Sequence, residues 1–528
     1  MTLFHRTLIL GCSSLALAGC GADEISSPGT GGNITINNPP APTPTPTPTP
    51  TSTMVTPANG CPTISDPQGL TDDGTITGPT GEYRVCTMPS RFNASTNLPY
   101  IAGLLYRMNG RVDVGTDGGP TPDATDGASD SNVKLTIEPG AIIYASGSSF
   151  LMVNRGSSID ATGTAARPIV FTSRDNVLGL NSDSSSGQWG GIVLAGRAQV
   201  TDCIAAGATP GTTGCERQVE GAAQPALFGG ATNSDSSGKM SYVQIRYSGF
   251  VLSGNNELQS LTTGGTGTGT TFDHIMSFNS SDDGVEFFGG YVNAKYLVVV
   301  GWEDDALDTD TGVQTNLQYV IAVQRAGAGD TVIEADSTNV FNDSTPRQNT
   351  QISNGTFIHR NSASNPVVRI RGGADYAIVN TVVVAESGSS CLRIDDTETT
   401  RAANAGLDDR GAPRFNSLGF DCATPFRDGS GGVSAANAET IFNAGSNNRT
   451  RVTATPYTNT LTMTFVNGAN ETAYPVFDPT SLSSFFNAVT YVGAVSGIAD
   501  TWYEGWTCNS TTVSLGTNVG DCTSLPVY

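Results

Sequence analysis

Acidic side chains recur at a regular spacing in three consecutive segments, residues 272–290, 295–312 and 316–336. Each segment contains a short apolar strand, a polar turn and a second strand of alternating polarity. A repeat of this length is typical of a solenoid, in which each segment forms one coil of a stack. Because stacking places the acids of successive coils above one another, the sequence predicts a lengthwise acidic stripe. Carboxylates in such a stripe can bind cations, or act in pairs as acid and base.

The second strand of each coil carries a charged residue between mostly apolar ones, as in Val285-Glu286-Phe287. Side chains alternate across a strand, so the apolar residues face inward and the charged residues face outward. Neighbouring coils lie about 4.8 Å apart. The predicted column contains Glu286, Asp308, Glu334, Arg369 and Arg393, with Gln259 of the preceding coil above it. A second column, two residues further along each strand, contains Asp310, Asp336, Arg371 and Asp395.

Three adjacent carboxylates repel one another at this distance unless a cation or an opposite charge lies between them. Two interpretations stay open. In the first, the arginines below and the solvent above balance the charge. In the second, the stripe is the floor of a ligand-binding groove. The candidate groove residues are Gln259, Glu286, Asp308, Glu334, Arg369, Arg371 and Arg393.

The turns that precede these strands add more acids. Calcium binds about six to eight oxygen ligands, and oxygen-rich turns that contain glycine supply them. The candidate calcium ligands are Asp282, Asp283, Asp304, Asp305, Asp308 and Asp310. The run Asp308 to Gly312 is only partly like a calcium-binding loop, because it lacks the third acid and the terminal glutamate. The alternative is that these are solvated residues that end the strands.

Catalysis has a weaker basis in the sequence. The run Asp282-Asp283-Gly284 resembles the paired-aspartate coil of polygalacturonase-type hydrolases, one group of pectin-degrading β-helix enzymes. The His-Gly and Arg-Ile-Lys elements of that group are missing, and the run 369–372 reads Arg-Ile-Arg-Gly without the lysine. Only His274 and His359 follow the signal segment, so neither a Ser-His-Asp triad nor a zinc–histidine site is indicated. The absence of a complete constellation favours binding over catalysis, and no catalytic residue is assigned.

Composition excludes one class of partner. The chain has 26 basic and 48 acidic residues, and its net charge is −22. A field of this sign repels nucleic acid and concentrates cations, so calcium, basic ligands or sugars held through a bridging metal are the favoured partners.

The first 20 residues predict the cellular location of the protein. An apolar run follows His5 and Arg6, which is typical of a secretory signal peptide. The ending Leu17-Ala18-Gly19-Cys20 resembles a bacterial lipobox, in which Cys20 becomes the lipidated first residue. Gly21 follows, and because it is not aspartate the resemblance implies anchoring in the outer membrane. The alternative is an ordinary cleaved signal peptide. Residues 21–60 are rich in proline and threonine, which predicts a disordered, semi-rigid stalk.

The remaining eight cysteines suit an oxidising compartment. Their spacing alone does not fix the connectivity. Neighbours in the sequence of a solenoid are neighbours in space, so we expect sequential disulfides. The expected pairs are Cys61 with Cys86, Cys203 with Cys215, Cys391 with Cys422, and Cys508 with Cys522.

Strand signals recur throughout the rest of the chain, which predicts an all-β fold. The Pro139-Gly140 turn, the turns at Gly156 and Gly163, and the strand 168–171 resemble the first coils of secreted right-handed parallel β-helices. We predict a parallel β-helix over residues 133–430, preceded by an N-terminal segment and cap over 61–132. Residues 431–528 are expected to form a C-terminal cap, with short helices over 435–445 and 480–489. An aromatic sugar platform around Trp502 and Trp506 is the alternative for that region.

A broader resemblance covers residues 189–394, with further matching elements at 491–494, Trp502 and Trp506. The chain resembles a family of uncharacterised outer-membrane or secreted β-helix lipoproteins from bacteria rich in TonB-dependent receptors. The matching elements are Trp189-Gly190-Gly191, Asn256-Glu257-Leu258, Ser281-Asp282-Asp283-Gly284, Asn293-Ala294-Lys295 and the run Asp304 to Gly312. The resemblance implies a fold and a location, but no established reaction.

These observations lead to one functional interpretation and two alternatives. The interpretation is a monomeric, lipid-anchored β-helix that binds a ligand at the outer membrane, with calcium as a cofactor and a TonB-dependent receptor or a polysaccharide as partner. The first alternative is a polysaccharide lyase or glycoside hydrolase that works in the acidic groove. The second is a purely structural or adhesive surface protein.

Overall fold

The structure is a computed structural model of the chain. It describes residues 54–122, 132–220, 222, 225–253, 256–337, 342–361, 365–386, 388–450, 461–516 and 520–528. All of the described residues belong to one compact unit. The predicted signal peptide, the lipid anchor Cys20 and most of the predicted stalk lie outside the described residues.

One parallel sheet forms a single face of every coil. Its eleven strands pair in the order β3-β6-β9-β12-β18-β20-β22-β24-β26-β28-β30. Their bounds are Arg91–Phe92, Val112–Val114, Leu151–Val153, Ile192–Ala195, Leu261–Gly264, Val285–Phe288, Leu307–Asp310, Ile333–Ala335, Val368–Ile370, Ser390–Ile394 and Thr424–Arg427. This sheet carries the charged columns.

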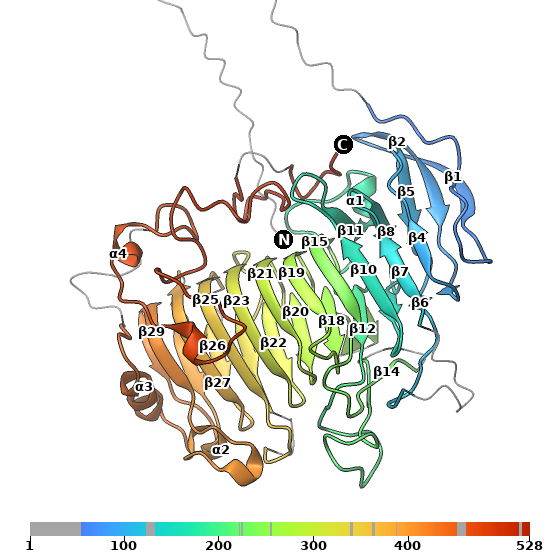
Figure 1. Cartoon of the computed structure of the whole chain (residues 1–528). Coiled ribbons are helices and arrows are strands. Elements are labelled where there is room, and N and C mark those ends of the chain that lie inside the picture. Colours follow the sequence, from blue (N-terminus) through green and yellow to red (C-terminus); the bar gives the residue numbers. More distant parts are fainter. Residues whose placement is uncertain are drawn as a thin grey trace, which may run out of the picture. The chain divides into compact units, whose positions relative to one another are not determined.

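A second sheet forms the other two faces, and its strands stack side by side in chain order (Figure 1). Its main path is β1 (Thr71–Gly78), β2 (Gly81–Thr87), β5 (Leu104–Arg107), β8 (Ile142–Ala145), β11 (Ile169–Ser173), β15 (Gly238–Arg246), β19 (Thr271–Phe278), β21 (Asn293–Val300), β23 (Gln314–Val323), β25 (Asn349–His359), β27 (Asp375–Ala385) and β29 (Arg414–Asp421). A branch consists of β4 (Thr96–Leu98), β7 (Lys134–Ile137) and β10 (Ser158–Thr162). Among the described strands of this sheet, only the β1–β2 pair is antiparallel.

The long strands of the second sheet each bend at one residue. The first half of β15 pairs with β10 and its second half pairs with β11. Between the two halves lies Tyr242, whose φ is 53°. The bend repeats in the following strands at His274, Tyr296, Tyr319, Asn354, Asn380 and Ser417, all with positive φ. Each coil therefore has three faces, and the predicted all-β parallel β-helix is confirmed.

Aromatic stacking accompanies the unusual backbone at the bend. Bulky residues rarely adopt positive φ. The rings of Tyr242 and His274 stack with centroids 4.2 Å apart, those of His274 and Tyr296 at 4.4 Å, and those of Tyr296 and Tyr319 at 4.8 Å. A continuous ring stack thus forms along this corner of four coils.

The inside of the coils is apolar. Val285, Phe287, Leu307 and Ile333 belong to one buried cluster, with the equivalent residues of the other coils. The alternation predicted from the sequence therefore holds, because the charged residues between them lie on the outer face. Buried side chains of this kind each contribute about 1.5–3 kcal/mol to the free energy of unfolding.

The parallel coils begin earlier than residue 133. Strand β2 already pairs with β5 in parallel, β3 with β6 and β4 with β7. These strands are two to seven residues long, and several are too short for an alternating pattern to identify them. The antiparallel β1–β2 hairpin precedes them, and the Cys61–Cys86 disulfide ties it to residue 61.

Helix α3 (Ala435–Ala444) packs on the last coil. Phe442 on this helix contacts the rings of Phe415, Phe420 and Phe426. The predicted helix over 435–445 is thus present and covers the final strands. The shorter helices are α1 (Arg174–Val177), α2 (Thr397–Thr400), α4 (Ala469–Thr472) and the 3-10 turns Ala405–Leu407 and Pro479–Ser481. No helix in the described part of the chain is long and apolar enough to cross a membrane.

Residues 461–528 differ from the expected terminal cap. They run back toward the first coils, along the corner at which the long strands of the second sheet bend (Figure 1). Asn380 Nδ2 donates to Phe477 O at 2.8 Å, Asn354 Nδ2 donates to Tyr491 O at 3.0 Å, and Arg246 Nη1 donates to Cys522 O at 2.9 Å. These side chains pair with backbone carbonyls of the returning segment, a pattern that hydrophobic periodicity does not reveal. Only Pro479–Ser481 is helical within the predicted helix 480–489.

All four sequential disulfides are present. They join Cys61 to Cys86, Cys203 to Cys215, Cys391 to Cys422, and Cys508 to Cys522. The prediction of local bridges is confirmed, and each bridge joins cysteines 12 to 31 residues apart in the sequence.

Candidate cation-binding site

The charged column lies on the outer face of the first sheet. Glu286 of β20 lies opposite Asp308 of β22, Asp308 opposite Glu334, Glu334 opposite Arg369, and Arg369 opposite Arg393. The predicted order of these five residues is therefore confirmed by the strand pairing. Gln259 is a correction, because the residue opposite Glu286 in β18 is Thr262. Gln259 lies in the turn before the strand and accepts a hydrogen bond from Thr262 Oγ1 at 2.5 Å.

The preceding turns form a second repeated element. Asp282, Asp304 and Asp330 occupy equivalent positions in three successive coils. The residue after each of them links the coils. Asp305 N donates to Asp283 Oδ1 at 2.9 Å, and Thr331 N donates to Asp305 Oδ1 at 2.6 Å. These hydrogen bonds from backbone N–H groups to carboxylates of the preceding coil fix the positions of the turns that carry Asp282 and Asp304.

A long excursion between β12 and β15 covers part of this face. It contains the hairpin of β13 (Arg217–Gln218) and β14 (Leu227–Phe228), and the Cys203–Cys215 disulfide closes one of its loops. The ring of Phe228 packs on that of Phe288 with centroids 5.9 Å apart. A second hairpin, β16 (Val251–Ser253) with β17 (Asn256–Glu257), adds the Glu257 side chain. As a result, Glu286 points outward yet is only 5% exposed.

Together these elements enclose an acidic cavity of about 400 Å³. Its lining residues are Arg217, Glu220, Glu257, Gln259, Asp282, Asp283, Glu286, Phe288, Asp304, Asp308, Asp310, Asp336 and Arg371. Nine carboxyl groups thus face two guanidinium groups. This imbalance is far from the paired charges that buried sites normally contain.

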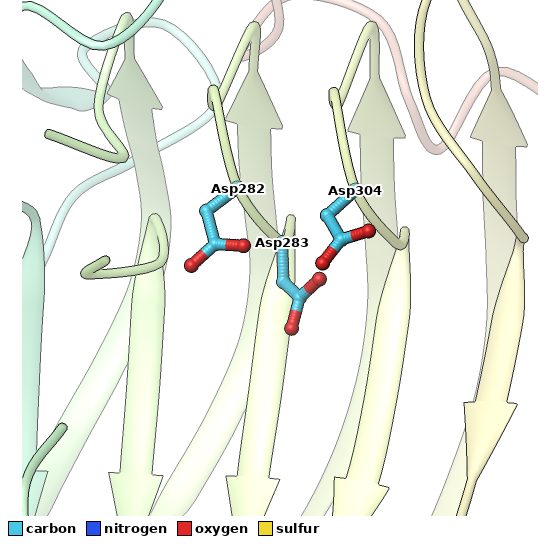
Figure 2. A group of neighbouring side chains, drawn as sticks. All are labelled: Asp282, Asp283 and Asp304. Carbon is cyan, nitrogen blue, oxygen red and sulfur yellow. The ribbon is translucent and has the colours of Figure 1, made fainter. Parts of the chain in front are cut away.

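The carboxyl groups converge in two overlapping sets. Asp282, Asp283 and Asp304 form the first, and Asp283, Glu286 and Asp308 form the second. One oxygen from each member lies within 4.8 Å of the others in its set. Figure 2 shows the first set, with Asp282 and Asp304 reaching toward Asp283 from turns of neighbouring coils. Two oxygens that both coordinate one calcium ion are at most about 4.6–5.2 Å apart, so each set has the spacing of ligands to a single ion.

Two buried oxygen atoms in the cavity lack partners. Glu286 Oε2 and Asp308 Oδ1 make no hydrogen bond with any residue that the structure describes. A buried polar atom without a partner costs about 1–3 kcal/mol, and more when it is charged. The two atoms belong to residues that lie opposite each other on neighbouring strands of the column.

Burial and mutual repulsion raise the pKa values of these groups. Burial, with Asp304 and Glu257 nearby, raises the pKa of Asp282 to about 8. Burial is also the main cause that raises the pKa values of Asp283, Glu286 and Asp308 well above their usual range, and neighbouring carboxylates add to it. Without a cation, these carboxyl groups therefore hold protons at a pH at which exposed acids are ionised.

Further along the column the charge is balanced. Arg369 Nη1 lies 2.8 Å from Glu334 Oε1, and Arg369 Nε lies 3.0 Å from Asp395 Oδ2. Arg393 Nε lies 2.7 Å from Asp395 Oδ1, and Arg371 Nε lies 3.2 Å from Glu334 Oε1. We call Glu334, Arg369, Arg371, Arg393 and Asp395 the ion-pair cluster. Of the two interpretations of the stripe, charge balance by arginines describes this part of the column.

The structure brings five of the six candidate calcium ligands into the acidic cavity. Asp305 is the exception, because its Oδ1 accepts hydrogen bonds from Thr331 and the residue does not line the cavity. Of the candidate groove residues, Gln259, Glu286, Asp308 and Arg371 line it, whereas Glu334, Arg369 and Arg393 do not. Sequence reasoning missed Glu220 and Arg217 and gave Glu257 no role in a site. All three lie in excursions that have no coil period, so no spacing places them.

Comparison with known proteins gives one match. Residues 127–507 match the model of the family described as the pectate-lyase like beta helix domain. No curated protein and no solved structure matches the chain. The matched range includes every coil that contributes to the acidic cavity and most of the returning segment.

Proposed function

The chain belongs to the pectate-lyase-like β-helix family, and on that premise we propose that it is a surface protein that binds calcium in the acidic cavity and a carbohydrate ligand through that ion. A β-helix domain of this family fits a surface or carbohydrate-related protein. The observation that carries the proposal is Glu286, a buried carboxylate whose Oε2 has no partner among the described residues, in a cavity lined by nine acids.

The chemistry of the lining selects the ion. The negatively charged groups that could coordinate an ion are all carboxylates, and neither histidine nor cysteine lines the cavity in the described part of the chain. Calcium prefers such oxygen ligands and accepts irregular arrangements of about six to eight of them, whereas magnesium requires a smaller, near-octahedral site. Asp283 belongs to both sets of converging carboxylates, so we assign it the central position in the site.

The position of the site suits a ligand that completes the coordination. Asp304 is exposed at the mouth of the cavity, whereas Asp283 and Glu286 are buried at its base. An ion held at the mouth can accept hydroxyl or carboxylate oxygens from a sugar. Arg217 and Arg371 line the same cavity and can donate to an anionic group of that ligand.

The test compares equivalent aspartates in successive coils. Calcium binding to the wild-type protein is measured by isothermal titration calorimetry and by native mass spectrometry. Asp304→Asn removes a cavity carboxylate and should weaken calcium binding by at least tenfold. Asp330→Asn makes the same change one coil further, outside the cavity, and should leave the affinity unchanged. Equal effects from the two variants, or no retained metal in the wild type, would contradict the proposal.

A second candidate function is cleavage of a polysaccharide. The observation that favours it is the pKa of about 8 for Asp282, because a carboxyl group that keeps its proton near neutral pH can serve as the general acid of a glycoside hydrolase. Incubation with a panel of plant and bacterial polysaccharides should then release new reducing ends, or an unsaturated product if the enzyme is a lyase. Activity lost in Asp282→Asn and Asp283→Asn would establish it. A protein that binds the polysaccharide and never shortens it supports the binding function instead.

We also propose that Cys20 carries a lipid that anchors the protein in the outer membrane. A TonB-dependent receptor lies in the same membrane and is the proposed partner. The sequence Leu17-Ala18-Gly19-Cys20 supports the anchor. Cys20→Ser should abolish labelling by a fatty-acid analogue and leave the precursor unprocessed. Unchanged labelling of that variant would refute the assignment. A surface protein with neither ligand nor metal would fit the structural or adhesive alternative.

A further inference from the structure

A second cavity lies on another face of the coils, at the start of the long strands of the second sheet. Its volume is about 230 Å³. The lining residues are Thr268, Tyr291, Asn293, Gln314, Thr315, Asn316, Asn349, Gln351, Arg410, Leu482 and Ser483. Five of them carry amides and four carry hydroxyl groups. We call this the amide cavity.

The amide cavity is the electrostatic opposite of the acidic cavity. No carboxylate belongs to its lining in the described part of a chain that has 48 acidic residues. The single charged lining residue is Arg410, which is exposed and forms no ion pair within the described residues. The lining therefore offers a metal ion no charged ligand, and the nearby carboxylate of Asp408 accepts a hydrogen bond from Gln314 Nε2 at 3.0 Å.

Several of the amides are held in a hydrogen-bonded chain across coils. Gln351 Nε2 donates to Asn316 Oδ1 at 2.7 Å, and Asn316 Nδ2 donates to Asn293 Oδ1 at 2.7 Å. The residue opposite Gln351 in the next coil is Ala377, which is small. Arg414 therefore reaches across it, and its Nη2 donates to Gln351 Oε1 at 3.4 Å. This chain fixes the orientation of these three amides, so that part of the cavity wall is organised before any ligand binds.

One amide oxygen in the cavity has no partner among the described residues. Asn349 lies opposite Gln314, on the same outer face as Asn316 and Gln351. It is only 4% exposed, and its Oδ1 accepts no hydrogen bond from any residue that the structure describes. Buried amides in folded proteins are normally satisfied, so an unpartnered one in a cavity marks a place for a ligand donor.

The remaining walls add an aromatic surface and a boundary. Tyr291 lines the cavity and is fixed by its hydroxyl, which donates to Gln199 Oε1 at 3.0 Å. Leu482 and Ser483 come from the returning C-terminal segment. Gln318 anchors that segment nearby, because its Nε2 donates to Asn487 O at 3.0 Å and its Oε1 accepts from Asn487 N at 2.9 Å. The docked C-terminal segment therefore forms one wall of the cavity.

We propose that the amide cavity is a second carbohydrate site, which binds one neutral sugar ring without a metal ion. Sugar hydroxyls both donate and accept hydrogen bonds, as do amides, and fixed amides select them by direction. Tyr291 offers an apolar ring face beside a polar tip, which suits the mixed surface of a sugar. The cavity is smaller than the roughly 300–1,000 Å³ of sites for drug-sized ligands, so it holds a single ring of a longer chain.

This proposal does not rest on calcium binding in the acidic cavity. The test therefore runs in the presence of a chelator. Four soluble probes, cellohexaose, xylohexaose, mannohexaose and maltohexaose, are titrated into the wild-type protein, and binding is followed by isothermal titration calorimetry and saturation-transfer NMR. At least one probe should bind in the chelator, with an affinity that changes less than twofold between low and moderate salt.

Variants locate the binding. Asn349→Ala should lower the affinity for the probe by at least tenfold, and Arg410→Ala should lower it about threefold. Arg174→Ala removes an exposed arginine on α1, remote from the cavity, and should bind as the wild type does. Glu286→Gln changes the acidic cavity and should also leave this binding intact. Because Arg410 is exposed, its variant folds even if Asn349→Ala does not. Absence of binding by all four probes, or binding that Arg410→Ala and Asn349→Ala leave unchanged, would overturn the proposal.

Discussion

The two halves of one charged column behave as opposites. Glu286 and Asp308 occupy the same outward strand position as Glu334, Arg369 and Arg393, in the same sheet and in the same register. In the first half, nine carboxyl groups line a cavity with only two arginines, one of which, Arg371, also belongs to the ion-pair cluster. In the second half, the ion-pair cluster gives each acid at least one guanidinium within 3.2 Å.

Two local features separate the halves. The excursion between β12 and β15 covers part of the first half, where Glu286 is 5% exposed, whereas the arginine side chains of the second half are 20–31% exposed. The residue types differ as well, because arginines replace acids from β26 onward. An acidic cluster alone therefore indicates little. What distinguishes the first half is the combination of burial with an excess of carboxyl groups over arginines.

The two halves also respond to pH with opposite sign. Burial raises the pKa values of Asp282 and its neighbours, so the cation-free cavity stabilises the fold less as pH rises from about 4 toward 8. Burial alone would raise the pKa of Asp395 as well, but hydrogen bonds from Ser430 N, Arg393 and Arg369 lower it overall. The contribution of Asp395 is therefore present at neutral pH and is lost in acid.

The largest expected effect is that of calcium on the acidic cavity. At pH 8, calcium at a hundredfold excess over its dissociation constant should stabilise the protein by about 2.7 kcal/mol relative to the chelated protein. At pH 5 the same calcium concentration should stabilise it much less, because protons occupy the carboxylates whose pKa values are raised. Thermal unfolding at both pH values, with and without chelator, measures the difference. Identical unfolding curves at pH 8 would show that the cavity binds no calcium.

A smaller loss is expected from breaking the ion-pair cluster. Arg369→Met leaves Glu334 with Arg371 and Asp395 with Arg393. Arg369 is 27% exposed and Asp395 is 1% exposed, so the cost should lie between those of surface and buried pairs, about 2 kcal/mol. Chemical unfolding at pH 7 measures it, and calcium should not restore the loss.

Arg107→Met is the matched control for that variant. It removes an arginine that pairs with Asp73 at 2.9 Å in an accessible position. Its cost should stay below about 1 kcal/mol. If both variants cost the same, the ion-pair cluster has no special stabilising role.

The column could be predicted because strand alternation has a period of two and the coils repeat. Once Val285, Leu307 and Ile333 are assigned to the core, the residues between them must face outward. The misplacement of Gln259 has the same origin. In the run Leu258-Gln259-Ser260-Leu261-Thr262, two polar residues each follow a leucine, and both fit the alternation. Only the strand pairing shows that Thr262 occupies the column.

The walls of the acidic cavity could not be predicted. Glu220 and Arg217 reach the site on a hairpin that interrupts the repeat, and Glu257 reaches it on another. The burial of Glu286 depends on these walls and is therefore also invisible in the sequence. The amide cavity escaped prediction for a related reason. Asn293, Asn316 and Gln351 lie near the starts of long strands. From the sequence alone, polar residues at such positions are assigned to the preceding turn rather than to a strand.

The smallest and most specific effect concerns a single charge at the centre of the column. Asp308→Asn keeps the shape of the side chain and removes the carboxylate that faces Glu286. Relief of repulsion between neighbouring like charges on a sheet is worth up to about 1 kcal/mol, so the chelated variant should be more stable than the chelated wild type at pH 8. The stabilisation by calcium should shrink in the same variant. The substitution Asp395→Asn, in the ion-pair cluster, should instead destabilise the protein, because Arg369 and Arg393 lose their shared partner. Opposite signs for one chemical change at two places would establish that the halves differ in charge balance. Equal signs would mean that the arginines neutralise the whole column, and the calcium assignment would then fail.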